Sequence, residues 1–64
     1  MEVKEIIPNL NKPVYYNDTE YTLTAGIIRK DEQNKIFYQA EILDKCGRSV
    51  CIVKLDNVEV RAHT

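Results

Sequence analysis

The sequence contains no tryptophan, only two glycines and two prolines, and no apolar run long enough to cross a membrane. Two glycines are too few for a glycine-rich loop that cradles phosphate. Because no apolar stretch lies near the first residue, we also expect no signal peptide. Nine basic residues against ten acidic ones give a net charge of −1, and no run of like charge exceeds two residues. This balance argues against a strongly basic nucleic-acid binder and against a membrane partner.

Cysteine and histidine are also scarce, with Cys46, Cys51 and His63 as the whole set. If Gly47 and Arg48 form a two-residue hairpin turn, the two thiols are offset along the hairpin, which is poor geometry for a disulfide. The three residues would supply at most three strong metal ligands and contain no CxxC knuckle, so we expect no metal site. Two reduced thiols are typical of a cytoplasmic protein.

What the sequence does have is a set of β-branched residues suited to one small core. Thirteen residues are Val or Ile and only four are Leu, a bias that favours strands over helices. With 64 residues, the chain is expected to form a single domain, 1–64. Domains of this size bury only about 60% of the surface that the unfolded chain exposes, so their stability is marginal.

Residues 1–12 are predicted to lie outside the strands of the domain. Their apolar residues follow helical spacing, but Pro8 interrupts the pattern and disfavours a helical residue before it. We therefore expect Val3–Ile7 to be a short extended segment and Asn9–Lys12 to be a loop.

The rest of the chain predicts short strands joined by tight turns. Alternating apolar and polar residues are typical of half-buried strands. Turn residues follow at Asn17–Thr19, one turn of 3₁₀ helix is expected at Leu55–Asn57, and Gly26 indicates a bulge or bend. The expected strands are Pro13–Tyr16, Glu20–Lys30, Ile36–Asp44, Ser49–Lys54 and a closing strand bearing Val58, Val60 and Ala62. The residues expected to face the core are Tyr21, Leu23, Ala25 and Ile27 in the second strand and Ile36, Tyr38, Ala40 and Ile42 in the third.

One strand is expected to differ from the others in its burial. The run Val50–Val53 is apolar at every position. Such a run is typical of a strand that is covered on both faces, and its register cannot be read from periodicity.

The run from Val53 to Val60 resembles the end of Src-homology-3-like barrels, in which a leucine leads into a 3₁₀ turn and a valine-bearing strand closes the barrel. This resemblance implies an all-β fold, a small five-stranded barrel over residues 13–62 with a 3₁₀ turn before the last strand. Peptide-binding members of that family also use a tryptophan and an acidic loop between the first two strands. This chain has no tryptophan, and Asn17–Thr19 is too short for that loop, so binding of proline-rich peptides is not carried over.

A second resemblance concerns the origin of the chain. Residues 14–24 resemble stretches in small uncharacterised proteins of bacterial mobile elements and phages. Ile, Asn, Lys and Tyr make up 22 of the 64 residues, a composition that AT-rich coding produces. The resemblance names no activity.

The leading functional hypothesis is a small interaction module that binds a protein partner or itself. Alternation places Tyr15, Phe37 and Leu43 on the face of the strands opposite the core, where they would form an exposed apolar patch. The edge of the short closing strand is a further place where another chain could pair. The alternative to an exposed patch is that the N-terminal segment covers these residues with Ile6, Ile7 and Leu10.

The second hypothesis is weak nucleic-acid binding by cations beside the hairpin loops. The candidate residues are Arg29, Lys30, Lys35, Lys45 and Arg48. Phe37 is the nearest aromatic residue on which a base could stack. Asp31, Glu32 and Asp44 dilute the positive charge of these clusters.

No pattern in the chain indicates catalysis, so we expect neither an enzyme nor a cofactor. His63 lies next to the last residue, where a general base is poorly positioned. An aromatic cage for a methylated cation is a further alternative, with Tyr15, Tyr16, Phe37 and Glu41 as its candidates.

Overall fold

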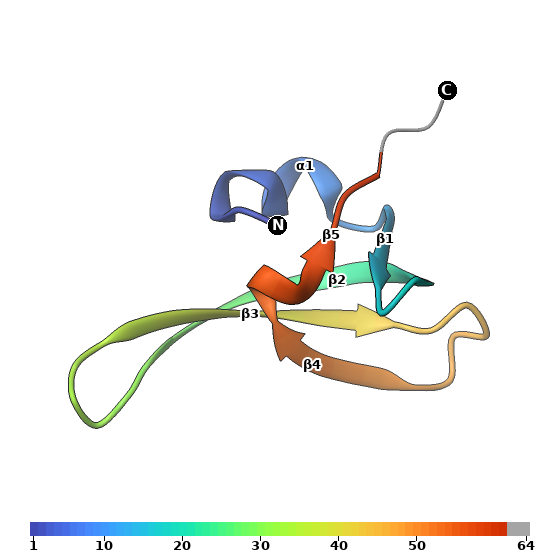
Figure 1. Cartoon of the computed structure of the whole chain (residues 1–64). Helices are drawn as coiled ribbons and strands as arrows, with labels where there is room; N and C mark the ends of the chain where they lie inside the picture. Colours follow the sequence, from blue (N-terminus) through green and yellow to red (C-terminus); the bar gives the residue numbers. More distant parts are fainter. Residues whose placement is uncertain (62–64) are drawn as a thin grey trace.

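Five antiparallel strands form one open sheet in the computed structural model, which describes residues 1–61. In space the strands follow the order β4-β3-β2-β1-β5, and the short helices lie beside the sheet (Figure 1). The strands are β1 (Pro13–Tyr16), β2 (Thr19–Lys30), β3 (Ile36–Leu43), β4 (Val50–Lys54) and β5 (Val58–Glu59). The helices are η1 (Val3–Glu5), α1 (Ile6–Asn9) and η2 (Leu55–Asn57). The predicted all-β character is confirmed, as is the 3₁₀ turn at Leu55–Asn57. None of the helices within residues 1–61 has the length and apolar character needed to span a membrane.

The first hairpin closes through the turn chemistry that the sequence predicts. Tyr16 pairs with Thr19, and the two residues between them, Asn17 and Asp18, have φ angles of 51° and 60°. Positive φ at both central residues matches the right-handed twist of the flanking strands, and Asn and Asp tolerate it better than most residues.

In each of the other two hairpin loops, an aspartate side chain accepts hydrogen bonds from backbone N–H groups of the same loop. Asp31 Oδ1 accepts hydrogen bonds from the backbone N–H groups of Gln33 and Lys35, at 2.8 and 2.9 Å. Asp44 Oδ1 accepts one from the N–H of Arg48, at 2.9 Å. A left-handed residue follows three positions after each aspartate, Asn34 at φ 65° and Gly47 at φ 70°.

The loop between β3 and β4 is longer than the two-residue turn expected at Gly47 and Arg48, so that expectation is wrong. Asp44 donates its N–H to the carbonyl of Ser49, so the loop spans four residues. Cys51 pairs with Ile42, whereas a two-residue turn would have placed it opposite Asp44. The carboxylate cap and the left-handed glycine stabilise the longer loop.

A β-bulge in β2 changes which residues face the core. Leu23 pairs with Ile42, but the register then shifts, and Gly26 is the next β2 residue opposite a core residue, Ala40. The expectation that Ala25 and Ile27 face inward is therefore wrong, because the extra residue of a bulge reverses the faces beyond it.

The core is small and lies where β1, β2, β3, η2 and β5 meet. Its buried members are Val14, Leu23, Ala40, Ile42, Leu55 and Val58. Tyr16 and Tyr21 are half-buried against it, with their rings edge to face at a centroid distance of 6.3 Å. Tyr38 shares the core-facing side of β3 but lies beyond the core and is exposed, which corrects its expected burial.

The N-terminal segment is helical rather than extended. Pro8 falls in the first turn of α1, where the N–H that proline lacks would have no helical acceptor, so the ring is tolerated. Ile6 packs onto Gly26 of β2, and Leu10 and Met1 also contact the core. The Met1 ammonium donates to the Val58 carbonyl at 2.6 Å. These contacts attach the segment to the sheet.

The last two strands also differ from expectation. Val50, Cys51 and Ile52 are exposed, because β4 is the edge strand of the sheet and only β3 lies beside it. The run is therefore not covered on both faces. The closing strand β5 comprises only Val58 and Glu59; Val60 lies outside it, and Ala62 lies outside the described residues.

The close approach of Ile6 to Gly26 leads to a testable prediction. A Cβ atom at position 26 would lie 2.7 Å from Ile6 Cγ2, so Gly26→Ala is expected to lower the free energy of unfolding by about 1 kcal/mol. In an Ile6→Ala background the same substitution should cost less, because the clashing methyl groups are gone. Urea unfolding of the four proteins measures both costs. Equal costs in the two backgrounds would contradict this packing.

Candidate functional site

The β2–β3 hairpin extends past the end of β4 as a two-stranded arm, residues 28–38 (Figure 1). Pairing of β3 with β4 begins at Gln39, opposite Lys54. Beyond that pair the chain leaves the sheet into η2. The stretch Ile36–Tyr38 therefore has β2 on one side and no strand on the other.

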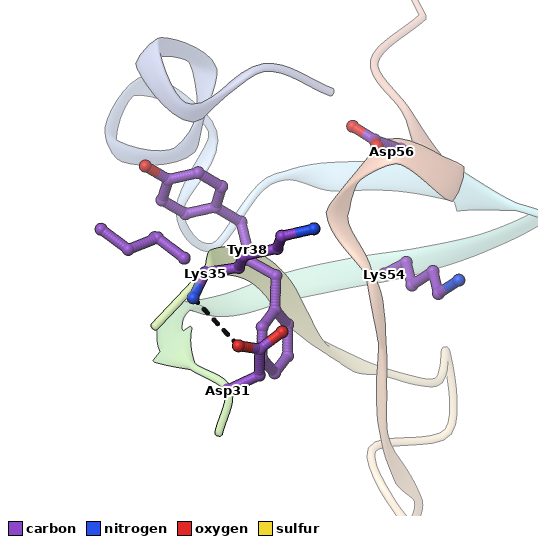
Figure 2. Close-up of a pocket in the computed structure, with 7 residues that line it drawn as sticks. Asp31, Lys35, Tyr38, Lys54 and Asp56 are labelled. Atoms are coloured by element: carbon purple, nitrogen blue, oxygen red, sulfur yellow. Dashed lines mark hydrogen bonds between the residues drawn. The ribbon is translucent and has the colours of Figure 1, made fainter. Parts of the chain in front are cut away.

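A surface cavity of about 490 Å³ lies at this unpaired edge. Figure 2 shows Asp31, Lys35 and Tyr38 on one side of it, and Lys54 and Asp56, from the end of β4 and from η2, on the other. Consecutive strand residues point to opposite faces, so a cavity lined by Ile36, Phe37 and Tyr38 together opens at the strand edge rather than on one face. We call these seven lining residues, which include four charged ones, the β3 notch.

The backbone of the β3 notch offers hydrogen-bonding groups as well as apolar side chains. Asp44 donates its N–H to Ser49 on the β4 side, and backbone groups in an antiparallel ladder alternate between neighbours. Every second residue before Asp44 therefore directs its N–H and C=O toward this edge, down to Tyr38 and Ile36. An extended segment of another chain is the partner that such an edge accepts.

The arm also carries a concentration of exposed apolar surface. Ile28 pairs with Tyr38, and the two side chains share a face. Their exposed fractions are 69% and 37%, and those of Ile36 and Phe37 are 60% and 39%. Neighbouring apolar side chains that are left in water are typical of an interaction surface.

The three residues of the predicted patch share one face but do not form one patch. The strand pairing puts Tyr15, Phe37 and Leu43 on the side of the sheet opposite the core. Phe37 and Leu43, however, are six residues apart on β3, or roughly 20 Å. Phe37 lines the β3 notch, while Leu43 is half-buried and pairs with Val50 at the other end of the strand. The N-terminal residues Ile6 and Leu10 pack against the core rather than over this face.

Tyr15 is covered by a charged cluster of its own chain. The Arg61 guanidinium carbon lies 4.2 Å from the centroid of the Tyr15 ring, a cation–π contact. Arg61 also pairs with Asp18 at 2.7 Å and with Glu59 at 3.3 Å, and Asp18 raises the Arg61 pKa. Tyr15 donates its hydroxyl proton to Glu20 at 3.1 Å, and that hydrogen bond raises the Tyr15 pKa.

The candidate nucleic-acid-binding cations lie at two separate ends of the sheet. Arg29, Lys30 and Lys35 are on the arm, and Arg29 pairs directly with Phe37. Lys45 and Arg48 are in the loop after β3, at the far end of that strand. Arg29 donates to Gln39 Oε1 at 2.6 Å, and Lys45 lies 3.9 Å from Glu20. Two clusters separated by the length of β3 do not make one continuous basic surface.

Sequence reasoning missed most of the β3 notch, although one signal for it was available. The strand predicted over Ile36–Asp44 is longer than its hairpin partner Ser49–Lys54. Two strands of unequal length joined by a tight turn leave one unpaired end. That end holds Ile36 and Tyr38, which alternation assigned to the core.

Among residues 1–61, the two cysteines form neither a disulfide nor part of a metal site. Cys46 and Cys51 are free and exposed. Within residues 1–61, no three His, Cys, Asp or Glu side chains gather as a metal site requires. His63, the remaining candidate, lies outside the described residues.

Comparison of this chain with known protein families, with characterised proteins and with solved structures gives no match.

The Tyr15–Glu20 hydrogen bond predicts a specific pH dependence. Ionisation of Tyr15 breaks this bond, so its pKa in the folded state lies above the ordinary value of 10.0. The stabilisation that it contributes is present below pH 10 and is lost as the pH rises through the folded pKa. Glu20→Gln removes the carboxylate and should lower the Tyr15 pKa toward the ordinary value. An NMR titration of the four tyrosines, with Tyr15→Phe to assign the signal, measures the change. An unchanged Tyr15 pKa in Glu20→Gln would contradict the interaction.

Proposed function

We propose that this chain is a small non-enzymatic interaction module that binds a protein partner at the β3 notch. The single observation that carries the proposal is the cavity at the unpaired edge of Ile36–Tyr38, where apolar side chains and strand-edge backbone groups meet. An extended partner segment would hydrogen-bond to the backbone of Ile36 and Tyr38 and place an apolar side chain in the cavity. The charged rim, Asp31 and Lys35 against Lys54 and Asp56, would orient the segment.

The proposal includes an Src-homology-3-like arrangement of the strands in a cytoplasmic protein. Two features support the fold: β2, β3 and β4 follow one another as a meander, and β1 lies between β2 and β5. The 3₁₀ turn between β4 and β5 supports it further. The β3 notch lies between the β2–β3 loop and this turn.

Nucleic-acid binding by the arm is the second candidate, favoured by the direct pairing of Arg29 with Phe37. A base stacked on Phe37 would have a guanidinium beside it. Asp31 and Glu32 in the adjoining loop oppose phosphate binding. If this candidate holds, affinity for a single strand falls steeply with salt and is lost in Arg29→Glu/Lys30→Glu/Lys35→Glu.

The test of the proposal is an affinity capture from native lysate with and without nuclease. A partner that binds at the β3 notch should still be captured after nuclease treatment. It should be lost with Phe37→Glu, because binding would remove the new carboxylate from water, which costs free energy. Val3→Glu is the matched control: Val3 has a similar exposure, 44% against 39% for Phe37, but lies in η1 and does not line the cavity. It should retain the partner.

The other possible results of this experiment lead to different conclusions. Loss of the partner with both variants, or with neither, contradicts the β3 notch as the binding site. Capture that disappears with nuclease, and with the arm charge reversals, replaces the proposal with the second candidate. Circular dichroism of each variant establishes that it is folded.

A further inference from the structure

Strand β1 carries an aromatic side chain between two carboxylates. Tyr15 lies directly opposite Glu20 of β2 and directly opposite Glu59 of β5. Side chains at opposite positions of neighbouring strands share one face of a sheet, so the three residues form a row in which the ring has a glutamate on each side. The Tyr15 hydroxyl donates to Glu20 at 3.1 Å, a contact that restrains the ring.

This row already holds a guanidinium group, that of Arg61. The guanidinium carbon lies 4.2 Å from the centroid of the Tyr15 ring. Nη2 donates to Asp18 at 2.7 Å, and Nε donates to Glu59 at 3.3 Å. A planar guanidinium can stack on a ring and bond to carboxylates through its edge at the same time, which a compact ammonium group cannot do. Tyr15, Asp18 and Glu59, which we call the Tyr15 site, therefore have the arrangement that recognises an arginine side chain.

The Tyr15 site and the residue that occupies it are held in different ways. Tyr15 and Glu59 belong to paired strands, whereas Arg61 follows the end of β5 and belongs to no strand or helix. The contacts of Arg61 are also open to water, since its side chain is 39% exposed and that of Asp18 is 90% exposed. Ion pairs at such positions contribute little to stability. An arginine from another chain can therefore replace Arg61 without breaking the strand pairing.

We propose that the Tyr15 site binds an arginine side chain of a partner protein, and that Arg61 occupies the site until that arginine displaces it. Arg61 is then a tethered competitor that lowers the affinity for the partner. With Arg61 displaced, the Tyr15 site keeps two carboxylates and has Glu20 beside it, and Lys45, 3.9 Å from Glu20, is the cation that remains close. The local charge therefore favours a cationic occupant. The site shares no residue with the β3 notch, so this binding does not depend on the proposed function.

The experiment is an NMR titration at low salt with the capped peptide acetyl-Gly-Arg-Gly-amide, followed through the backbone amide signals of β1. Arg61→Gln removes the tethered competitor and should bind the peptide roughly two- to fivefold more tightly than the unaltered protein, the range expected when an exposed ion pair is the competitor. Arg61→Lys keeps the charge but cannot contact the ring and both carboxylates together, so its affinity should be intermediate. The same peptide with lysine in place of arginine should bind more weakly to all three proteins.

Two further variants separate recognition by the ring from attraction by charge alone. Tyr15→Leu/Arg61→Gln keeps the carboxylates but lacks the aromatic face, and it should lose most of the binding. Lys4→Gln is the matched control, because it removes one positive charge, as Arg61→Gln does, from an exposed residue of η1 that pairs with Glu2. It should leave the affinity unchanged. Circular dichroism of each variant establishes that it is folded.

Four results would overturn the proposal. These are no binding of the arginine peptide to folded Arg61→Gln, equal binding of the arginine and lysine peptides, binding that persists without the Tyr15 ring, and an equal gain of affinity in Lys4→Gln. Phe37 is not part of the Tyr15 site, so Phe37→Glu should leave the peptide affinity unchanged. Failure of partner binding at the β3 notch and failure of arginine binding at the Tyr15 site are therefore distinguished by separate variants.

Discussion

The bulge between Leu23 and Ala25 is the constraint on which the rest of the structure depends. It moves Gly26 to the core-facing side, and because glycine has no side chain, Ile6 can pack directly on the strand and hold the N-terminal helices in place. Beyond Gly26 the same side of β2 continues with Ile28 and reaches the arm, where no helix or strand covers it. One inserted residue therefore sets where the core ends and where exposed apolar surface begins.

Polar residues fix the lengths of the strands around this core. Asp31 and Asp44 each cap a hairpin loop with one carboxylate oxygen, and each loop includes one left-handed residue. These loops position the two ends of β3 independently of the core. Because β4 stops at Lys54, opposite Gln39, the paired strands β2 and β3 continue past the last residue of β3 that has a partner in β4. The cavity at Ile36–Tyr38 is a consequence of that difference in length.

Local chemistry in the sequence was enough to predict the turn at Asn17 and Asp18, the 3₁₀ turn at Leu55 and most strand bounds, because these turns act through their own backbone. It did not predict the length of the loop between β3 and β4, where the carboxylate of Asp44 stabilises four loop residues instead of two. Face assignment succeeded for Tyr15, Phe37 and Leu43, since no bulge separates them from the pairs that set their face. It failed for Ala25 and Ile27, because nothing in the alternation marks an inserted residue. The helical segment around Pro8 was missed because a helix tolerates proline in its first turn, and the sequence pattern does not show where this helix begins. Exposure of β4 depends on strand order, which periodicity does not encode.

The unpaired stretch of β3 and the edge strand β4 differ in shape and in charge. At the β3 notch the free stretch of strand is short and is bounded by charged side chains on both sides. Along β4 the residues from Val50 to Val53 are apolar, and Val50 and Ile52 are exposed. A cavity with a charged rim can fix the position of a partner's side chain, which a row of exposed apolar side chains cannot do, and for this reason the binding proposal rests on the β3 notch.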